Sequence, residues 1–216
     1  MNIVLFGPPG SGKGTQGDKL VKKFDLFRIS SGDLLREEVR KNTNLGKEIS
    51  LTLEKGNLVS DEIINKLIEI IVSNKKYHER IIFDGYPRNL SQAKNLNNLL
   101  KKNNQKISHV INLKVSKEIV IKRILGRRTC TKCGLIFNEY FKPPANAKHI
   151  CGTKFLTKRS DDNEKTITYR YETYIEKTLP ILSYYKKLNL LHEIDGKREI
   201  NEIFKKISDI IASLEA

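Results

Sequence analysis

The feature that most constrains the fold lies at the start of the chain, where a short apolar run leads into a glycine-rich segment. Residues 2–6 read NIVLF, which is typical of a buried parallel strand, and residues 7–13 then give the pattern G-x-x-x-x-G-K. The apolar spacing from Lys13 to Lys23 predicts a helix directly after this loop. A strand, a glycine-rich loop and a helix in this order predict a phosphate cradle, because the loop amides and the positive end of the helix face one anion.

The cradle departs from the usual pattern at one position. Serine or threonine normally follows the lysine, whereas here Gly14 follows Lys13 and the hydroxyl comes one place later, on Thr15. We expect Lys13 to reach the β- and γ-phosphates of a nucleotide, and Thr15 to lie at the metal–phosphate end. The sequence of the loop thus indicates nucleotide binding and leaves open which nucleotide enzyme this is.

The rest of the chain alternates between short apolar runs and segments with helical spacing. Strands are expected at 2–6, 26–30, 80–84, 109–115 and 190–196. Helices are expected at 13–23, 32–41, 46–56, 61–74, 91–103, 116–127 and 199–214, with a further long helix that begins near Asp162 or Asn163 and is kinked or divided by Pro180. This alternation predicts an α/β fold of the P-loop NTPase type, with a parallel sheet covered by helices on both faces.

A second group of candidate functional residues follows the expected third strand, in the segment DGYPRNLSQ from Asp84 to Gln92. The segment should lie at the carboxyl end of the parallel sheet, where ligands bind. Asp84 could hold a hydrated Mg²⁺ beside the cradle, and Arg88 offers a planar fork suited to a phosphate. We therefore expect both side chains to face the glycine-rich loop.

The composition limits the classes of function. The net charge is +15, which suits either a nucleic-acid-binding protein or a protein with solvated lysines. We favour the second interpretation, because the lysines are scattered in pairs and the aromatic residues form no interleaved stacking patches. The sequence has no run of 18 apolar residues and no secretory signal pattern, so we expect a cytosolic protein that does not bind a membrane. We also expect no binding to nucleic acid.

Five segments together resemble the adenylate kinases with a long lid, a branch of the nucleoside monophosphate kinases. They are GPPGSGKGTQ, SSGDLLR, DGYPRNLSQ, GRR at 126–128 and KRSDDNE at 158–164, and they cover essentially the whole chain in the family's order. The resemblance implies a monomer with a five-stranded core at 1–29, 60–125 and 163–216. It also implies an AMP-binding insert at 30–59 and a small β-rich lid at 126–162.

The resemblance also implies a role for individual residues. The positions that match the family's ATP site are Gly10, Ser11, Gly12, Lys13, Gly14, Thr15, Arg127, Ile136, Phe137 and Arg198. The positions that match its AMP site are Ser31, Arg36, Asn57, Leu58, Val59, Gly85, Tyr86, Pro87, Arg88, Gln92, Arg159 and Arg170. Catalysis would fall to Lys13, Arg88, Arg127, Arg159 and Arg170. Ser31 stands where threonine is usual, and Gln92 would recognise the adenine edge with its amide.

The implied reaction is reversible transfer of the terminal phosphoryl group from MgATP to AMP, giving two ADP. The acceptor is an ionised phosphate, so no general base is required, and alignment with charge neutralisation should carry catalysis. Two alternatives stay open from the residues alone. One is another nucleoside monophosphate kinase, acting on UMP or CMP, and the other is a basic nucleic-acid-binding module.

The three cysteines lie within the expected lid and suggest a structural metal site. Cys130 and Cys133 form half of a zinc knuckle, with two thiolates separated by two residues. The second half contains only Cys151, and a regular spacing would place Lys148 or Lys154 at the remaining position. Lysine is a poor zinc ligand, so His149 is a candidate for the fourth ligand. The alternative is a metal-free lid held together by packing and hydrogen bonds.

Overall fold

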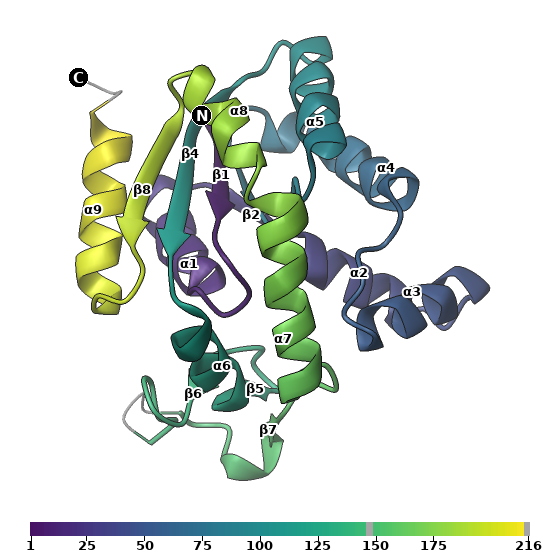
Figure 1. Ribbon diagram of the computed structural model, residues 1–216, viewed down its shortest axis with the longest axis vertical. Helices are drawn as coiled ribbons and strands as arrows, with labels where there is room; N and C mark the ends of the chain where they lie inside the picture. Colours follow the sequence, from purple (N-terminus) through teal and green to yellow (C-terminus); the bar gives the residue numbers. More distant parts are fainter. Residues whose placement is uncertain (146–148, 214–216) are drawn as a thin grey trace.

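The computed structural model describes residues 1–145 and 149–213, and its centre is a five-stranded parallel sheet (Figure 1). The strands run in the order β2-β3-β1-β4-β8. Their bounds are Asn2–Phe6 for β1, Phe27–Ser30 for β2, Ile81–Asp84 for β3, Ile107–Lys114 for β4 and Leu191–Asp195 for β8. The predicted α/β class is confirmed, and the carboxyl ends of β1 and β3 lie side by side because Leu5 pairs with Asp84.

Helices cover both faces of this sheet because each strand places alternate side chains on opposite faces. Ile3 and Leu5 of β1 pack with apolar residues of α1 and α9 on one face. Val4 and Phe6 point to the other face and pack with residues of α4, α5 and α8. The central strand β1 is buried along its whole length, which explains its continuous apolar run.

The helices closely follow the spacing of apolar residues. They are α1 (Lys13–Phe24), α2 (Ser31–Arg40), α3 (Asn44–Glu54), α4 (Asp61–Val72), α5 (Leu90–Lys102), α6 (Lys117–Leu125), α7 (Glu164–Thr173), α8 (Ile181–Lys187) and α9 (Ile200–Ala212). Short 3₁₀ turns occupy Lys75–Tyr77 and Thr153–Phe155. Gly56 lies just beyond α3 with a φ of 77°, as a glycine that ends a helix should. Ser60 precedes α4, but its side chain makes no capping hydrogen bond.

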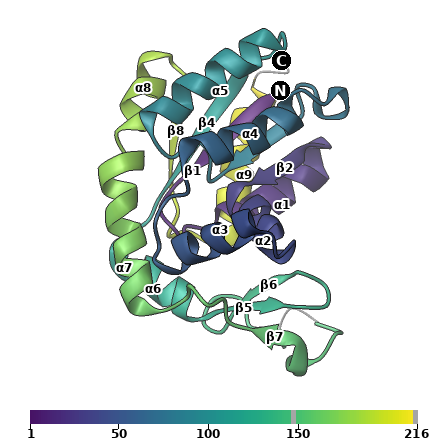
Figure 2. The same cartoon turned by 90° about the vertical axis from the view of Figure 1, so that its right-hand side faces the viewer.

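Two parts of the chain extend from the central sheet. Helices α2 and α3 project to one side in Figure 1. A second, antiparallel sheet of order β6-β5-β7 is formed by β5 (Arg127–Cys130), β6 (Ile136–Asn138) and β7 (Leu156–Thr157). Figure 2 shows this small sheet at the lower end of the molecule, where α6 leads into it and α7 leads out.

The predicted break in the long helix at Pro180 covers several residues that precede this proline. After α7, a π-helical segment covers Tyr174–Thr178, and Pro180 then precedes α8. Thr178 in this segment donates a hydrogen bond of 2.8 Å to the backbone oxygen of Arg88. The break therefore connects α7 to the turn that follows β3. None of the helices in the described part of the chain has both the length and the apolar content needed to cross a bilayer.

Candidate active site

A cavity of about 310 Å³ lies where the carboxyl ends of β1 and β3 meet α2, α7 and the small sheet. Its walls include the glycine-rich loop, Asp84 and Arg88, so the two motifs predicted to face each other do share one cavity. The other predicted residues that line it are Arg36, Asn57, Leu58, Gly85, Pro87, Arg127, Ile136, Phe137, Arg159, Arg170 and Arg198. These residues come from separate segments, and the fold brings them together.

The glycine-rich loop encloses the Lys13 ammonium group. The Lys13 Nζ donates to the backbone oxygens of Gly7 at 2.7 Å and Pro8 at 2.9 Å. Gly10 and Gly12 have φ values of 73° and 100°, which only glycine adopts without strain, and α1 begins directly after Gly12. Burial lowers the pKa of Lys13 to about 8, although Asp84 acts in the opposite direction. The loop thus brings a desolvated cation and the start of a helix next to one space in which an anion can bind.

The carboxylate of Asp84 lies at the end of β3 beside this loop. Asp84 is only 8% exposed, and its Oδ2 accepts a hydrogen bond of 3.0 Å from Nη1 of Arg28. Carboxylate oxygens are the ligands that Mg²⁺ prefers, and a hydrated Mg²⁺ needs only one or two of them when nucleotide phosphates supply the rest. The position and chemistry of Asp84 therefore fit a metal that arrives with a nucleotide.

Arg88 is fixed against the backbone of the same turn. Its Nε donates to the backbone oxygen of Gly85 at 2.7 Å, and its Nη2 donates to the hydroxyl of Ser31 at 3.2 Å. Burial and the neighbouring Arg170 lower the pKa of Arg88 to about 10. An arginine held in this way is oriented before any ligand binds, so a phosphate meets a rigid donor.

Two other arginines of the cavity, Arg127 and Arg170, are held by acidic partners. Arg127 forms a two-pronged ion pair with Asp162, in which its Nε lies 2.8 Å from Oδ2. Arg170 pairs with Asp161 at 2.7 Å. Burial, together with the charges of Arg127 and Arg36, lowers the pKa of Arg159 to about 10. The cavity therefore gathers several cations in one small volume and favours a ligand with several negative charges.

Four residues predicted for the AMP site do not line the cavity. They are Ser31, Val59, Tyr86 and Gln92, and each is at most 9% exposed. The Gln92 amide is engaged by the protein, because its Nε2 donates to Asp61 at 2.7 Å and its Oε1 accepts from the Arg88 backbone at 2.7 Å. In this arrangement Gln92 supports the Arg88 turn, and its recognition of adenine stays a prediction.

Several cavity residues were not found from the sequence. They are Arg28, Asp33, Arg123, Phe141 and Asp161. Arg123 precedes Arg127 by four residues, near the end of α6, and its guanidinium lies 5.4 Å from the centre of the Phe141 ring. Arg28 stands in a strand next to the SSGDLLR segment, but no spacing rule indicates that its side chain turns toward Asp84.

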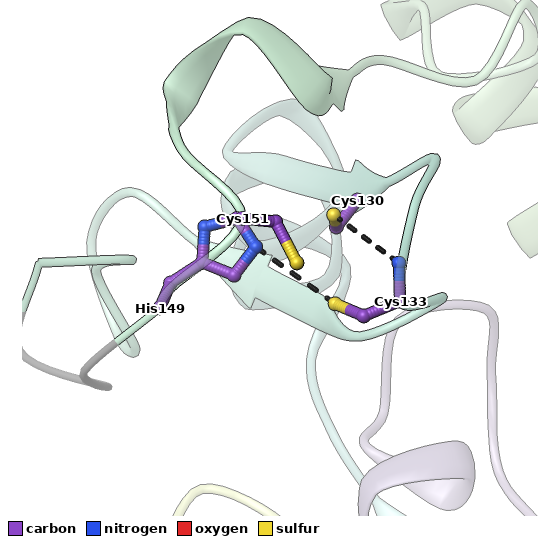
Figure 3. Close-up of side chains that lie close together, drawn as sticks. All are labelled: Cys130, Cys133, His149 and Cys151. Atoms are coloured by element: carbon purple, nitrogen blue, oxygen red, sulfur yellow. Dashed lines mark hydrogen bonds between the residues drawn. The ribbon is translucent and has the colours of Figure 1, made fainter.

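The cysteines and His149 form a separate group in the small-sheet segment (Figure 3). Cys130, Cys133, His149 and Cys151 each offer one ligand atom, and these four atoms lie within 4.8 Å of one another. The Cys133 sulfur lies 3.8 Å from Nε2 of His149. The structure brings His149 into this group, as the sequence suggested, while the alternative position Lys148 lies outside the described residues.

Comparisons with known proteins agree with this geometry. A sequence model of the family described as "Adenylate kinase" matches residues 5–190. An adenylate kinase of Pelagibacter ubique is 50% identical over 98% of this chain and 99% of its own length. Adenylate kinases of Archaeoglobus fulgidus and Fervidobacterium nodosum are 39% and 40% identical, and each alignment covers 100% of this chain and at least 99% of the relative.

Proposed function

The chain belongs to the adenylate kinase family, and from this premise we propose that the cavity between the Lys13 loop and Arg88 transfers the terminal phosphoryl group of MgATP to AMP, giving two ADP. The observation that carries this proposal is that the phosphate cradle and a rigid phosphate-binding arginine, from two adjacent strand ends, line the same cavity. Two nucleotides can then meet with their phosphate chains end to end.

The cavity has two sides that suit two nucleotides. We assign the glycine-rich loop, Arg127, the Ile136–Phe137 pair and Arg198 to ATP. We assign Arg36, the Asn57–Leu58 pair and the turn from Gly85 to Arg88 to AMP. Ser31 and Gln92 support this turn through hydrogen bonds with the Gly85 and Arg88 backbone, and the side chains of Val59 and Tyr86 are buried in one hydrophobic core cluster. We assign Arg159 and Arg170, which also line the cavity, to both phosphate chains.

Catalysis in this site depends on alignment and charge. The attacking oxygen of AMP is already ionised, so no side chain has to remove a proton. Lys13, Arg88 and the other cavity arginines neutralise charge on the transferred group and hold the two chains in line. Asp84 would hold a Mg²⁺ through water, and the ion would supply positive charge that neutralises part of the phosphate charge.

Closure of the site is part of the proposal because water competes with AMP for the phosphoryl group. We propose that 30–59 and 126–162 are the two inserts that close over a core of 1–29, 60–125 and 163–216. The cavity supports this division, since it is walled by residues of both inserts and of the core. A monomer in the cytosol stays a prediction.

The test of the reaction is a coupled assay of ADP formation from ATP and AMP. The assay should be inhibited by a bisubstrate analogue in which five phosphates join two adenosines. Replacing AMP by UMP, CMP or GMP should reduce turnover strongly. Comparable turnover with UMP or CMP would instead identify a different nucleoside monophosphate kinase.

The roles of Lys13 and Arg88 can be tested with matched variants. Lys13→Met and Arg88→Ala should each lower kcat/KM by roughly 10²–10⁴, by analogy with other electrostatic stabilisers. Lys66→Met and Arg80→Ala are suitable controls, because these cations form exposed ion pairs with Glu62 and Asp25. Near-normal turnover of Lys13→Met or Arg88→Ala would refute the assigned roles.

We also propose that the cysteine and histidine group holds a structural Zn²⁺. Ligand atoms around a tetrahedral zinc with bonds of about 2.3 Å lie about 3.7 Å apart. The observed group, with all ligand atoms within 4.8 Å, needs little rearrangement to reach that geometry. Because Cys130 ends β5 and Cys151 lies shortly before β7, the metal would staple the two strands of the small sheet.

Metal analysis of protein purified without added zinc should find one zinc per chain. His149→Ala should lose most of this metal, whereas His78→Ala should keep it, because His78 lies outside the group. Removal of the metal with a chelator should lower the melting temperature of the wild type. Metal-free protein with full thermal stability would eliminate the zinc proposal and favour a lid held by packing alone.

A further inference from the structure

Arg28 occupies an unusual position for a strand residue beside the active site. Its side chain is 20% exposed and extends from β2 along the surface of α1. Its Nε lies 3.0 Å from Oδ1 of Asp18, and its Nη1 lies 3.0 Å from Asp84 and 3.8 Å from Asp33. These three carboxylates, from α1, α2 and the end of β3, form what we call the acidic cluster. One guanidinium group thus connects three elements of the cavity wall.

The path of the Arg28 side chain depends on the packing at Gly17. Gly17 lies inside α1, where glycine is disfavoured, and it is buried. A Cβ atom at this position would lie 2.5 Å from Cδ of Arg28 and 3.5 Å from its Nε. The absence of a side chain at Gly17 therefore makes the room through which Arg28 reaches Asp84. Alanine would fit the helix better and displace the arginine.

We propose that Arg28 is a positioning residue for phosphoryl transfer, which holds the Asp84 carboxylate beside the phosphate cradle and weakens divalent-cation binding by the acidic cluster until nucleotide phosphates arrive. The proposal rests on the proposed function, because it concerns the metal that accompanies ATP. Asp84 uses Oδ2 for the arginine, so its orientation is set by a rigid planar donor and not by the metal alone.

The electrostatic part follows from the charges that face Asp84. Arg28 contributes one positive charge at hydrogen-bond distance, and Lys13 and Arg88 are further cations whose charges interact with that of Asp84. Asp33 is shared between Arg28 and Arg36, which lies 2.5 Å away. Removing Arg28 would leave Asp18 and Asp84 without this cation, and the attraction of the cluster for a divalent ion would rise. With Arg28 present, the phosphates of ATP supply the additional negative charge.

The experiment measures binding of Mn²⁺, a paramagnetic substitute for Mg²⁺, to nucleotide-free protein by electron paramagnetic resonance. Arg28→Gln should bind Mn²⁺ about tenfold more tightly than the wild type, since one unit charge near a divalent ion is removed at a partly solvated site. Its kcat for ATP plus AMP should fall several-fold, because Asp84 is no longer oriented. Arg28→Lys should keep the weak Mn²⁺ binding and still lose kcat, because it keeps the charge and loses the fork.

Gly17→Ala provides an independent arm that leaves the arginine in the sequence. It should shift Mn²⁺ affinity and kcat in the same direction as Arg28→Gln, and the double variant should show no further change. Arg80→Gln is the matched control and should behave like the wild type, because Arg80 precedes β3 at the opposite end of the sheet. If Arg28→Gln fails to fold, Gly17→Ala and Arg28→Lys decide the question.

Wild-type Mn²⁺ affinity together with wild-type kcat in Arg28→Gln would overturn the inference and reduce Arg28 to a structural ion pair. A loss of thermal stability without a change in Mn²⁺ binding would have the same meaning. Failure of the proposed function has a different signature. In that case the wild type forms no ADP from ATP and AMP, while the Mn²⁺ comparison between the variants still tests the electrostatic assignment.

Discussion

Replacement of Asp162 by asparagine should destabilise the protein substantially, because it breaks the most buried ion pair of the cavity. The Asp162 side chain is 0% exposed and receives two hydrogen bonds from Arg127, which is itself 15% exposed. Asparagine has the same size, but it loses the charge and turns one acceptor oxygen into a donor that faces the guanidinium. Breaking a buried pair in this way costs about 3–5 kcal/mol. We expect about 3 kcal/mol, since Arg127 keeps some contact with water.

Urea unfolding and thermal melting both measure this effect. For a chain of this length, about 3 kcal/mol corresponds to a fall in melting temperature of roughly 6–12 °C. Asp161→Asn should cost less, because Asp161 and Arg170 keep 17% and 21% of their side-chain surface exposed. Glu172→Gln, which breaks an exposed pair with Lys117, should change stability by less than about 1 kcal/mol. If Asp162→Asn and Glu172→Gln melt at the same temperature, burial of the pair does not have the importance that we assign to it.

Two further predictions concern acid sensitivity and a helix end. In the folded protein the pKa of His109 is lowered to about 4 by burial and by His192, whose ring nitrogen lies 3.1 Å away. In the unfolded chain this pKa is about 6.5, so on acidification the unfolded chain takes up the proton at a higher pH than the folded protein does. The contribution of His109 to the free energy of unfolding should be fully present above about pH 6.5, and the free energy of unfolding should be lower by about 2 kcal/mol at pH 5. Urea unfolding of His109→Asn should lack most of this loss. Gly56→Ala should lower the free energy of unfolding by about 1 kcal/mol or more in the same assay. The reason is that Gly56 has a φ of 77° and that a Cβ would lie 3.2 Å from Cγ of Arg170. Unchanged stability and kcat would contradict this prediction.

The central sheet and the location of the site were predictable because they depend on patterns along the chain. The continuous apolar run before Gly7 indicated a strand buried on both faces, and the structure places α1 and α9 on one face of it and α4, α5 and α8 on the other. Parallel strands bring their carboxyl ends to one edge of a sheet. Asp84 and the glycine-rich loop were therefore expected at the same edge, and they lie close together because β1 and β3 are neighbours in the sheet.

The partners of the charged residues were not predictable, because they depend on side-chain paths through space. The segment KRSDDNE shows one arginine and two aspartates, but the structure pairs both aspartates with arginines that lie outside the segment, Arg127 and Arg170. Ser60 precedes α4, where serine is a preferred capping residue, yet its side chain does not cap the helix. The spacing H-x-C at His149 belongs to no regular knuckle, so only the structure shows that His149 lies near Cys133.

We propose that the charges of the cavity couple ligand binding to closure of the two inserts. Lys13, Arg88 and Arg159 come from the glycine-rich loop, the β3 turn and the segment after β7, and burial lowers the pKa of each. Desolvated cations that face one another raise the free energy of a closed arrangement, and the ion pairs of Asp161 with Arg170 and of Asp162 with Arg127 offset part of this charge. A polyphosphate chain would supply the missing negative charge. The arginines to which we assign the phosphates would then favour the open form without ligand and the closed form with it, so that the site would close only around its substrates.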